Sequence, residues 1–303
     1  MSAPAASPLL QARMARVLAA NSPGLPTTEP HLGAALAEAL AGAGRLVRSA
    51  LVLQAGEIRG LEADRADDIA CAIEYWHLAS LMLDDLPSMD DASQRRGLPC
   101  VHRTHGEATA ILAALALINR AYTLVQRAFA GEESDVRQRA GHLVDEALGT
   151  AGILSGQAWD LRFEDGPGTA RDVGRIALRK TGALLWLAMS LPLLASGAWQ
   201  AERRILRALS VYWALVYQAM DDLIDVAAPG GAPNKTPGRD AALHRPNLAM
   251  ALGTPLVLRR IKRLLGLIDV RLSALCVRDP KWNYLADWHE RLFMARYRRF
   301  AAN

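Results

Sequence analysis

Four aspartates that follow a long apolar segment are the feature that most constrains how this chain can fold. Residues 66–83 are apolar with few breaks, which predicts a core helix. Asp84, Asp85, Asp90 and Asp91 come directly after it. Crowded carboxylates repel one another, so such a group is tolerated mainly where a cation neutralises it. The segment therefore predicts a buried helix that carries a cation site at its end.

Two arginines, Arg95 and Arg96, follow these aspartates closely. Magnesium keeps several waters, takes one or two carboxylates and completes its shell with phosphate oxygens, while arginine forks bind phosphate. The order of acids and arginines therefore predicts a site for Mg²⁺ and a diphosphate. A solvated, charged helix end is the alternative interpretation, but it would need neither the arginines nor a second acidic group elsewhere in the chain.

A second acidic group is present far downstream, in the sequence YQAMDDLID. Its members are Asp221, Asp222 and Asp225. Asp221 and Asp225 are four residues apart, which places both on one face of a helix. Two acidic groups that face each other across a helical core could hold one diphosphate through several metal ions.

The motifs DDLPSMD, RRG, KTG and DDLID occur in that order along the chain. In this the sequence resembles the trans-type polyprenyl diphosphate synthases and is most similar to bacterial geranylgeranyl diphosphate synthases. The resemblance runs from about Gly42 to Asp240, and SGQAWD, which contains Gly156, Gln157 and Asp160, also matches it. It implies an all-α fold, a single large helical bundle of the isoprenoid synthase type around a central active-site cavity.

The resemblance also implies an activity, that of a Mg²⁺-dependent prenyltransferase. Such an enzyme joins isopentenyl diphosphate to an allylic diphosphate, head to tail, and we expect the C20 product, geranylgeranyl diphosphate. Three alternatives stay open: a farnesyl diphosphate (C15) synthase, a terpene synthase on the same scaffold that adds no isopentenyl diphosphate, and a non-catalytic subunit of an active synthase. Two intact acidic groups argue against the last of these.

The site residues implied by the resemblance fall into four sets. The metal ligands are expected to be Asp84, Asp85, Asp90, Asp221, Asp222 and Asp225. The allylic diphosphate is expected to contact Arg95, Lys180, Thr181, Gln218 and Lys235. Isopentenyl diphosphate is expected to contact Arg45, Arg48, His77 and Arg96. The residues expected to act in catalysis itself are Asp84, Asp90, Lys180, Asp221 and Lys235.

The loop before Arg48 departs from the family pattern. In the family this loop reads glycine, lysine, arginine, an apolar residue, arginine and proline, and its basic residues hold isopentenyl diphosphate. Here Arg45 stands for the lysine, Leu46 for an arginine and Ser49 for the proline. A planar guanidinium and a point-like ammonium ask for different geometry at a phosphate site. The acceptor site is thus where this chain differs most from the pattern.

His77 falls on nearly the same face of the predicted helix as Asp84. A single histidine on an apolar helix is more often a hydrogen-bonded core residue than a ligand-binding one. The resemblance favours binding, because the acceptor-binding histidine of the family also lies seven residues before the first aspartate. Pro87, inside the first acidic group, is expected to bend the helix so that Asp90 rejoins Asp84.

Product length should depend on the residues about one turn before Asp84. Ala79 and Ser80 lie there, and both are small. In the family an aromatic ring at either position shortens the product to fifteen carbons. We therefore expect the growing chain to pass this turn and to stop at Tyr75 and Trp76, which favours twenty carbons.

The chain has 303 residues, of which 51% are hydrophobic and 22% are charged, and it can bury a sizeable core. We expect a flexible N-terminal leader over residues 1–28, which contain no Asp or Glu, and a single all-helical domain over residues 29–303. The leader fits a cytoplasmic bacterial protein, and a plastid transit peptide is the alternative. The resemblance implies a homodimer.

Substrates and partners are further bounded by charge and hydropathy. The formal net charge of +4 is not gathered in a dense basic tract, so we expect anionic small molecules and no nucleic acid. Three scattered cysteines suggest neither a disulfide framework nor a zinc site. Residues 181–201 carry no charge and are about as long as a membrane span, but Pro192 and Lys180 favour the central helix of a bundle. We therefore expect no membrane span.

Overall fold

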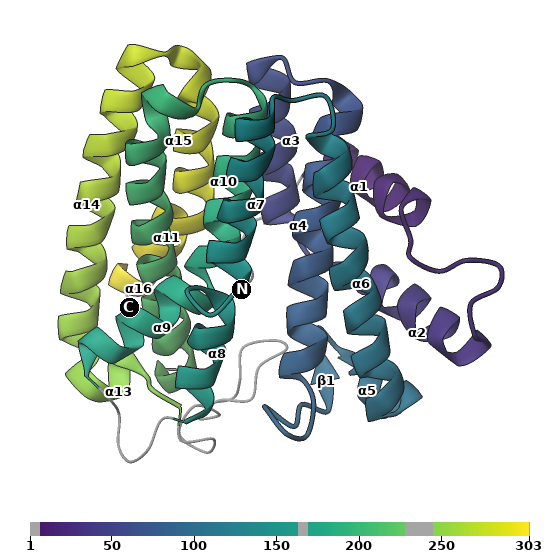
Figure 1. Ribbon diagram of the computed structural model, residues 1–303. Helices are drawn as coiled ribbons and strands as arrows, with labels where there is room; N and C mark the ends of the chain where they lie inside the picture. The colour runs from purple at the N-terminus through teal and green to yellow at the C-terminus, as the bar shows by residue number, and fades with distance from the viewer. Residues whose placement is uncertain (1–6, 163–168, 228–244, 303) are drawn as a thin grey trace. The chain divides into compact units, whose positions relative to one another are not determined.

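A computed structural model of the chain describes residues 7–162, 169–227 and 245–302 (Figure 1). By its internal contacts the chain divides into two compact units. The N-terminal unit comprises Ala5–Gly141 with Leu191–Gly197, and the C-terminal unit comprises His142–Ser190 and Ala198–Asn303. The expectation of a single domain over residues 29–303 stays a prediction, and each unit is described by itself.

The N-terminal unit is built from helices and one short hairpin. Its elements are α1 (Pro8–Ala20), α2 (Pro30–Ala41), α3 (Val47–Arg59), α4 (Ala63–Asp84), β1 (Gln94–Arg95), β2 (Leu98–Pro99), α5 (Val101–His105), α6 (Glu107–Ala128) and the first part of α7 (Ser134–Leu148). Helices α4 and α6 run side by side (Figure 1). The face of α6 that is buried is rich in alanine, which lets the two backbones approach closely.

The C-terminal unit contains the rest of the helices. Its elements are α8 (Ile153–Leu161), α9 (Ala170–Lys180), α10 (Gly182–Ala195), α11 (Trp199–Ala227), α13 (Leu248–Leu252), α14 (Thr254–Arg278), η1 (Pro280–Trp282), α15 (Asn283–His289), η2 (Glu290–Met294) and α16 (Ala295–Ala302). The last residues of α10 count with the other unit. Within the described residues the only strands are β1 and β2, so the predicted all-α class is confirmed.

Helix α4 is the core of the N-terminal unit. Thirteen of its 22 residues are buried, among them Ile69, Ile73 and Tyr75 without exposed surface. A side chain of this size contributes roughly 1.5–3 kcal/mol when it leaves water. The apolar segment thus explains why a helix forms here and why its end, where the aspartates begin, is held in place.

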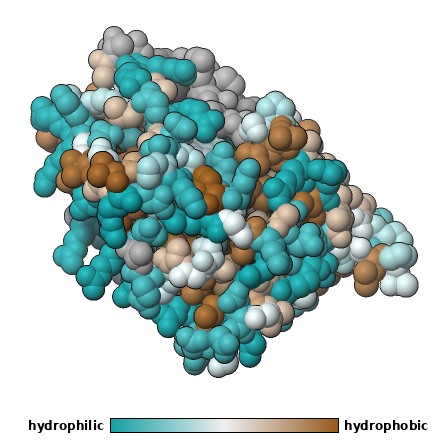
Figure 2. All heavy atoms as spheres, turned by 90° about the horizontal axis from the view of Figure 1, so that it is seen from above, coloured by the Kyte–Doolittle hydropathy of each residue, from teal (hydrophilic) through white to brown (hydrophobic). Residues whose placement is uncertain are grey.

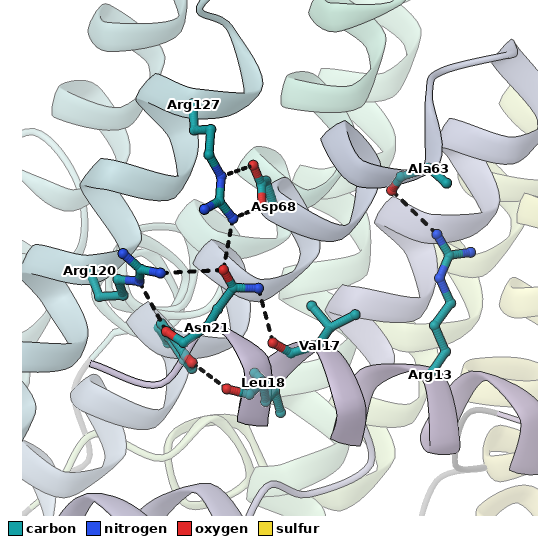
Figure 3. Close-up of polar contacts among 9 residues, drawn as sticks. Arg13, Val17, Leu18, Asn21, Ala63, Asp68, Arg120 and Arg127 are labelled. Atoms are coloured by element: carbon teal, nitrogen blue, oxygen red, sulfur yellow. Dashed lines mark hydrogen bonds and ion pairs between the residues drawn. The ribbon is translucent and has the colours of Figure 1, made fainter. Parts of the chain in front are cut away.

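The described part of the N-terminal leader is folded, which corrects the expectation of a flexible segment. Helix α1 buries Met14, Val17 and Leu18, and the Tyr75 hydroxyl donates to the Leu18 carbonyl at 2.7 Å. Polar contacts then join its C-terminal end to α4 and α6 (Figure 3). Composition gave the wrong prediction because a helix without acidic residues can still form hydrogen bonds to other helices. Asn21, at the end of α1, does so with α6.

Asn21 links three helices in this network. Its backbone carbonyl accepts from Arg120 at 3.0 Å, and its side-chain oxygen accepts from Arg127 at 2.7 Å. Arg127 also pairs with the buried carboxylate of Asp68 on α4, with a 2.7 Å bond from its Nε. A buried charge left without a partner is costly, so the network fixes α1 against both helices.

The C-terminal unit packs around α11. Trp213 is fully buried and stacks on His289 of α15, with Phe293 of η2 beside both rings. The expected single helix over residues 181–201 is two helices, because α10 ends at Ala195 and α11 begins at Trp199. These contacts hold the upstream half of the helix that carries the second acidic group.

Exposed apolar residues form small groups among hydrophilic ones on the face drawn in Figure 2. This distribution is ordinary for a protein surface. By length and composition α6 could cross a membrane, with 39% of its apolar window buried, and α9 with α10 would add a second span only if this pair, bent by 42°, were counted as one. Core helices pass the same test, so the finding is weak evidence for a span.

Candidate active site

The first acidic group lies at the C-terminal end of α4, in the N-terminal unit. Helix α4 ends at Asp84, and the chain then turns back so that the Asp90 amide donates to the Asp84 carbonyl at 3.0 Å. The predicted bend at Pro87 is therefore wrong, because the proline lies in this turn and not in a helix. The Leu86 amide donates to the carbonyl of Leu83, three residues earlier, at 3.2 Å. This bond closes a narrower turn than the α-helix has, so the α-helical pattern has already ended there. The turn achieves what was expected of the bend, since it brings Asp84 and Asp90 together.

Asp85 has a different role from its neighbours. It is 4% exposed, and both its oxygens accept from the Arg95 guanidinium, with Nε at 2.8 and 2.9 Å. A bidentate pair of this kind holds both partners in a fixed orientation. Of the three aspartates predicted as ligands here, Asp85 is buried and holds Arg95, and Asp84 and Asp90 are half-buried. Metal binding by all three stays a prediction.

The motif RRG forms the turn of the β1–β2 hairpin. The strands pair Arg95 with Leu98, which leaves Arg96 and Gly97 as a two-residue loop. Both have positive φ, 57° and 83°, as in the type I′ turn that fits the twist of a hairpin. A non-glycine residue with this backbone conformation is strained, and such strain is common at functional sites. The hairpin orients the two arginine side chains differently: Arg95 pairs with Asp85, and Arg96 donates to the Gly42 carbonyl.

A cationic cluster formed by Arg48, His77 and Arg96 lies beside this hairpin. Arg48 of α3 approaches the Nε2 atom of His77 to 3.3 Å. Burial, followed by the charges of Arg48, Arg96 and Arg95, holds the pKa of His77 well below its usual range. The imidazole is therefore neutral, and its Nε2 accepts from Arg48. Three arginines near one neutral ring form a site for an anion with several oxygens.

The residues at which this chain departs from the family pattern lie at the start of α3. Leu46 has a left-handed backbone with φ of 55° and is 7% exposed, so its side chain belongs to the core. Ser49 is also buried, and its hydroxyl donates to the Glu74 carboxylate at 2.9 Å. Burial raises the pKa of Glu74, against the opposing effects of Ser49, Arg48 and Arg96. Glu74 is thus a buried acid within electrostatic range of two arginines of the cationic cluster, Arg48 and Arg96.

The second acidic group lies on α11, in the C-terminal unit. Asp221 and Asp225 are four residues apart in one helix, as predicted. Asp222 has no exposed surface, and it accepts from Gln218 and from the Leu248 amide, both at 2.7 Å. In both acidic groups, then, the second aspartate of the DD pair is used for internal hydrogen bonds. Gln218 donates to Asp222, and its predicted contact with the allylic diphosphate stays a prediction.

Lys180 and Thr181 lie at the junction of α9 and α10. The Lys180 ammonium pairs with Asp160 of α8 at 2.8 Å, and Arg245 donates to the Asp160 carbonyl at 2.6 Å. Gly156 makes this possible, because a Cβ there would lie 2.6 Å from the Lys180 amide nitrogen. The motifs SGQAWD and KTG therefore meet, and the family signature that contains Asp160 has a structural reason.

Some predicted residues are not brought together or not described. Lys235 lies outside the described residues, so its two predicted roles stay predictions. Within the described ranges, no group of three or more His, Cys, Asp or Glu side chains is close enough to hold a metal ion. Arg45 contributes only at longer range, through its charge near Arg96. The donor set of each acidic group is nevertheless all carboxylate oxygen, which is what Mg²⁺ prefers.

Comparison with known proteins adds the family. The model for the family described as polyprenyl synthetase matches residues 29–255. The chain belongs to the polyprenyl synthetase family. It is 34% identical over 247 residues to a geranylgeranyl diphosphate synthase of Pantoea ananas, which covers 81% of this chain and 80% of the relative. It is 37% identical over 235 residues to the farnesyl diphosphate synthase of Escherichia coli strain K12, covering 76% and 77%.

Solved structures agree with this assignment. A Helicobacter pylori geranyltransferase complexed with magnesium and isoprenyl diphosphate superposes with a TM-score of 0.81 at 26% identity, covering 93% of this chain and 97% of that one. An FPP/GFPP synthase of Zymomonas mobilis gives a TM-score of 0.76, also at 26% identity, over 88% and 90%. As a polyprenyl synthetase with these relatives, the chain is a prenyltransferase, and the fold is that of the isoprenoid synthases.

Sequence reasoning about this polyprenyl synthetase missed Glu74, Ser49 and Arg245 as members of the site. Glu74 left a usable signal, because it is the only acidic residue between Ile69 and Leu83. A buried acid in an apolar helix needs a partner, which points to nearby basic residues. Arg245 left no comparable signal, since its partner is a backbone carbonyl that no side-chain pattern reveals.

The protonation of Glu74 yields a prediction about stability and pH. Because its pKa is raised in the folded protein, the folded state keeps this proton to higher pH than the unfolded chain does. Its favourable contribution is complete below the ordinary pKa and is lost as the pH rises through the folded pKa. Glu74→Gln should therefore gain stability relative to the native protein as the pH rises above the ordinary pKa of a glutamate carboxyl.

Urea unfolding at several pH values measures this difference. Glu133→Gln, which changes an exposed carboxylate away from the cluster, is the matched control for loss of one negative charge. If the difference in unfolding free energy between Glu74→Gln and the native protein were the same at every pH, the pKa of Glu74 would be equal in the folded and unfolded states. That result would contradict this interpretation.

Proposed function

We propose that the chain is a Mg²⁺-dependent geranylgeranyl diphosphate synthase, which condenses isopentenyl diphosphate with an allylic diphosphate. The observation that carries the proposal is the cluster of Arg48, neutral His77 and Arg96 next to the first acidic group. A terpene synthase has no second diphosphate to hold and would not need this cationic site. The names of the relatives support a prenyl diphosphate synthase of either C20 or C15 product.

The proposed roles of the residues follow from their chemistry. Asp84 and Asp90 at the end of α4, and Asp221 and Asp225 on α11, are the carboxylates that would hold Mg²⁺. When bound, Mg²⁺ supplies positive charge that stabilises diphosphate as it leaves the allylic carbon. The magnesium named with the Helicobacter pylori relative supports this part of the proposal.

The cationic cluster would hold the acceptor during the reaction. Arg48 and Arg96 offer planar donor forks to its diphosphate, and neutral His77 adds no charge that would repel the allylic cation. The double bond of isopentenyl diphosphate then attacks that cation, and loss of a proton gives a chain longer by one five-carbon unit. Lys180, positioned by Asp160, would bind the allylic diphosphate.

Product analysis tests this function. Mass spectrometry of the products from isopentenyl diphosphate and each of the three shorter allylic diphosphates should show geranylgeranyl diphosphate as the final product. Farnesyl diphosphate as the end product would make the chain a C15 synthase. A hydrocarbon or alcohol formed from an allylic diphosphate alone, with no use of isopentenyl diphosphate, would exclude the proposal in favour of a terpene synthase.

The proposal for product length can be refined by the packing of α4. Tyr75 donates to α1, and Trp76 meets Tyr122 of α6 edge to face, with ring centroids 5.5 Å apart. Ala79 has no exposed surface, so a ring there would overpack the core, whereas Ser80 is only half-buried. The Ser80 hydroxyl donates to the His77 carbonyl of its own helix at 2.8 Å. Ser80 is therefore the better of the two predicted positions for controlling chain length.

Substitution at Ser80 provides the second test. Ser80→Phe should move the main product from twenty to fifteen carbons while total consumption of isopentenyl diphosphate falls less than about tenfold, because the ring fills space needed only by the longer chain. Ser80→Ala, which removes the hydroxyl without adding bulk, is the control and should leave the twenty-carbon product dominant. Unchanged product length in Ser80→Phe would place the end of the cavity elsewhere.

A further inference from the structure

Arg96 lies directly on the backbone of a glycine from another part of the unit. A Cβ atom built on Gly44 would be 2.1 Å from the Arg96 Cζ and 2.3 Å from each of its terminal nitrogens. Heavy atoms that are not bonded do not approach so closely, so the guanidinium occupies the space of the missing side chain. The contact joins the loop before α3 to the hairpin turn between β1 and β2.

Two further interactions fix the guanidinium in this place. Its Nη1 donates to the carbonyl of Gly42 at 2.7 Å. The Arg96 backbone is held with φ of 57° by the hairpin, so the side chain starts from a set direction. Burial lowers the pKa of Arg96, and the carboxyl of Glu74 opposes this effect.

We propose that Gly44 is a positioning residue for acceptor binding, because its lack of a side chain lets Arg96 rest on the loop of residues 42–44 and complete the cluster with Arg48 and His77. This inference rests on the proposed function, in which Arg96 binds isopentenyl diphosphate. Its importance is greater here because Leu46 is buried and apolar, which leaves Arg45 and Arg48 as the basic residues of the loop.

Gly44 is suited to a clean test because its backbone does not itself require glycine. It is absent from the glycines with positive φ, so alanine can adopt its conformation without strain. The three nearest atoms to the added methyl all belong to the tip of the Arg96 side chain. Gly44→Ala should therefore displace Arg96 and leave the loop and the fold intact.

Steady-state kinetics of the full chain are the experiment. Gly44→Ala should raise the KM for isopentenyl diphosphate roughly tenfold or more, the size expected for a lost charge-assisted hydrogen bond. The KM for the allylic diphosphate should change less than about twofold, since that substrate is proposed to use other residues. Gly42→Ala is the comparison, because it keeps the accepting carbonyl and its methyl makes only ordinary contacts, at 3.5 Å or more. Its effect should be clearly smaller.

A double-mutant cycle separates this inference from the proposed function. If Gly44 acts through Arg96, then Gly44→Ala should add nothing to the KM of the Arg96→Ala variant. A further rise in that background, a normal KM in Gly44→Ala alone, or a Gly44→Ala protein that does not fold would each overturn the inference. Failure of Arg96→Ala alone to raise this KM would instead refute the proposed role of Arg96 in acceptor binding.

Discussion

The site depends on keeping charges of one sign close together at the end of a buried helix. Three arginines lie within electrostatic range of His77. Two acidic residues lie close to these arginines. Asp85 pairs with Arg95 through both carboxylate oxygens, and the carboxyl of buried Glu74 lies within electrostatic range of Arg48 and Arg96. His77 responds by staying neutral. What is left is a cluster with surplus positive charge and fixed geometry, which is suited to a diphosphate that arrives with its own negative charge.

The sequence was sufficient for the class of fold and for the order of the motifs. Helical periodicity and the apolar segment over residues 66–83 predicted α4, and the spacing of Asp221 and Asp225 predicted one helical face. It was not sufficient for the contacts made within each DD pair. The internal hydrogen bonds of Asp85 and Asp222 depend on tertiary neighbours, Arg95 and the Leu248 amide, which lie on other elements.

Local rules failed where a tertiary contact decided the outcome. Pro87 seemed to bend a helix, but the helix has already ended when the chain reaches it. An acid-free leader seemed flexible, but Arg13, Asn21 and the Leu18 carbonyl find partners on α4 and α6 (Figure 3). Ser49 looked like a simple loss of the family proline. Its hydroxyl in fact provides the hydrogen bond that a buried Glu74 needs, which no pattern along the chain could show.

The central claim is that this prenyltransferase holds two diphosphates and that the cluster of Arg48, His77 and Arg96 holds the second one. The most direct measurement is a calorimetric titration of the full chain with isopentenyl diphosphate, in the presence of Mg²⁺ and an unreactive thiolo analogue of an allylic diphosphate. The account predicts saturable binding of one isopentenyl diphosphate per chain, weakened when Arg96 is replaced by alanine. Binding of the analogue with no binding of isopentenyl diphosphate would contradict it.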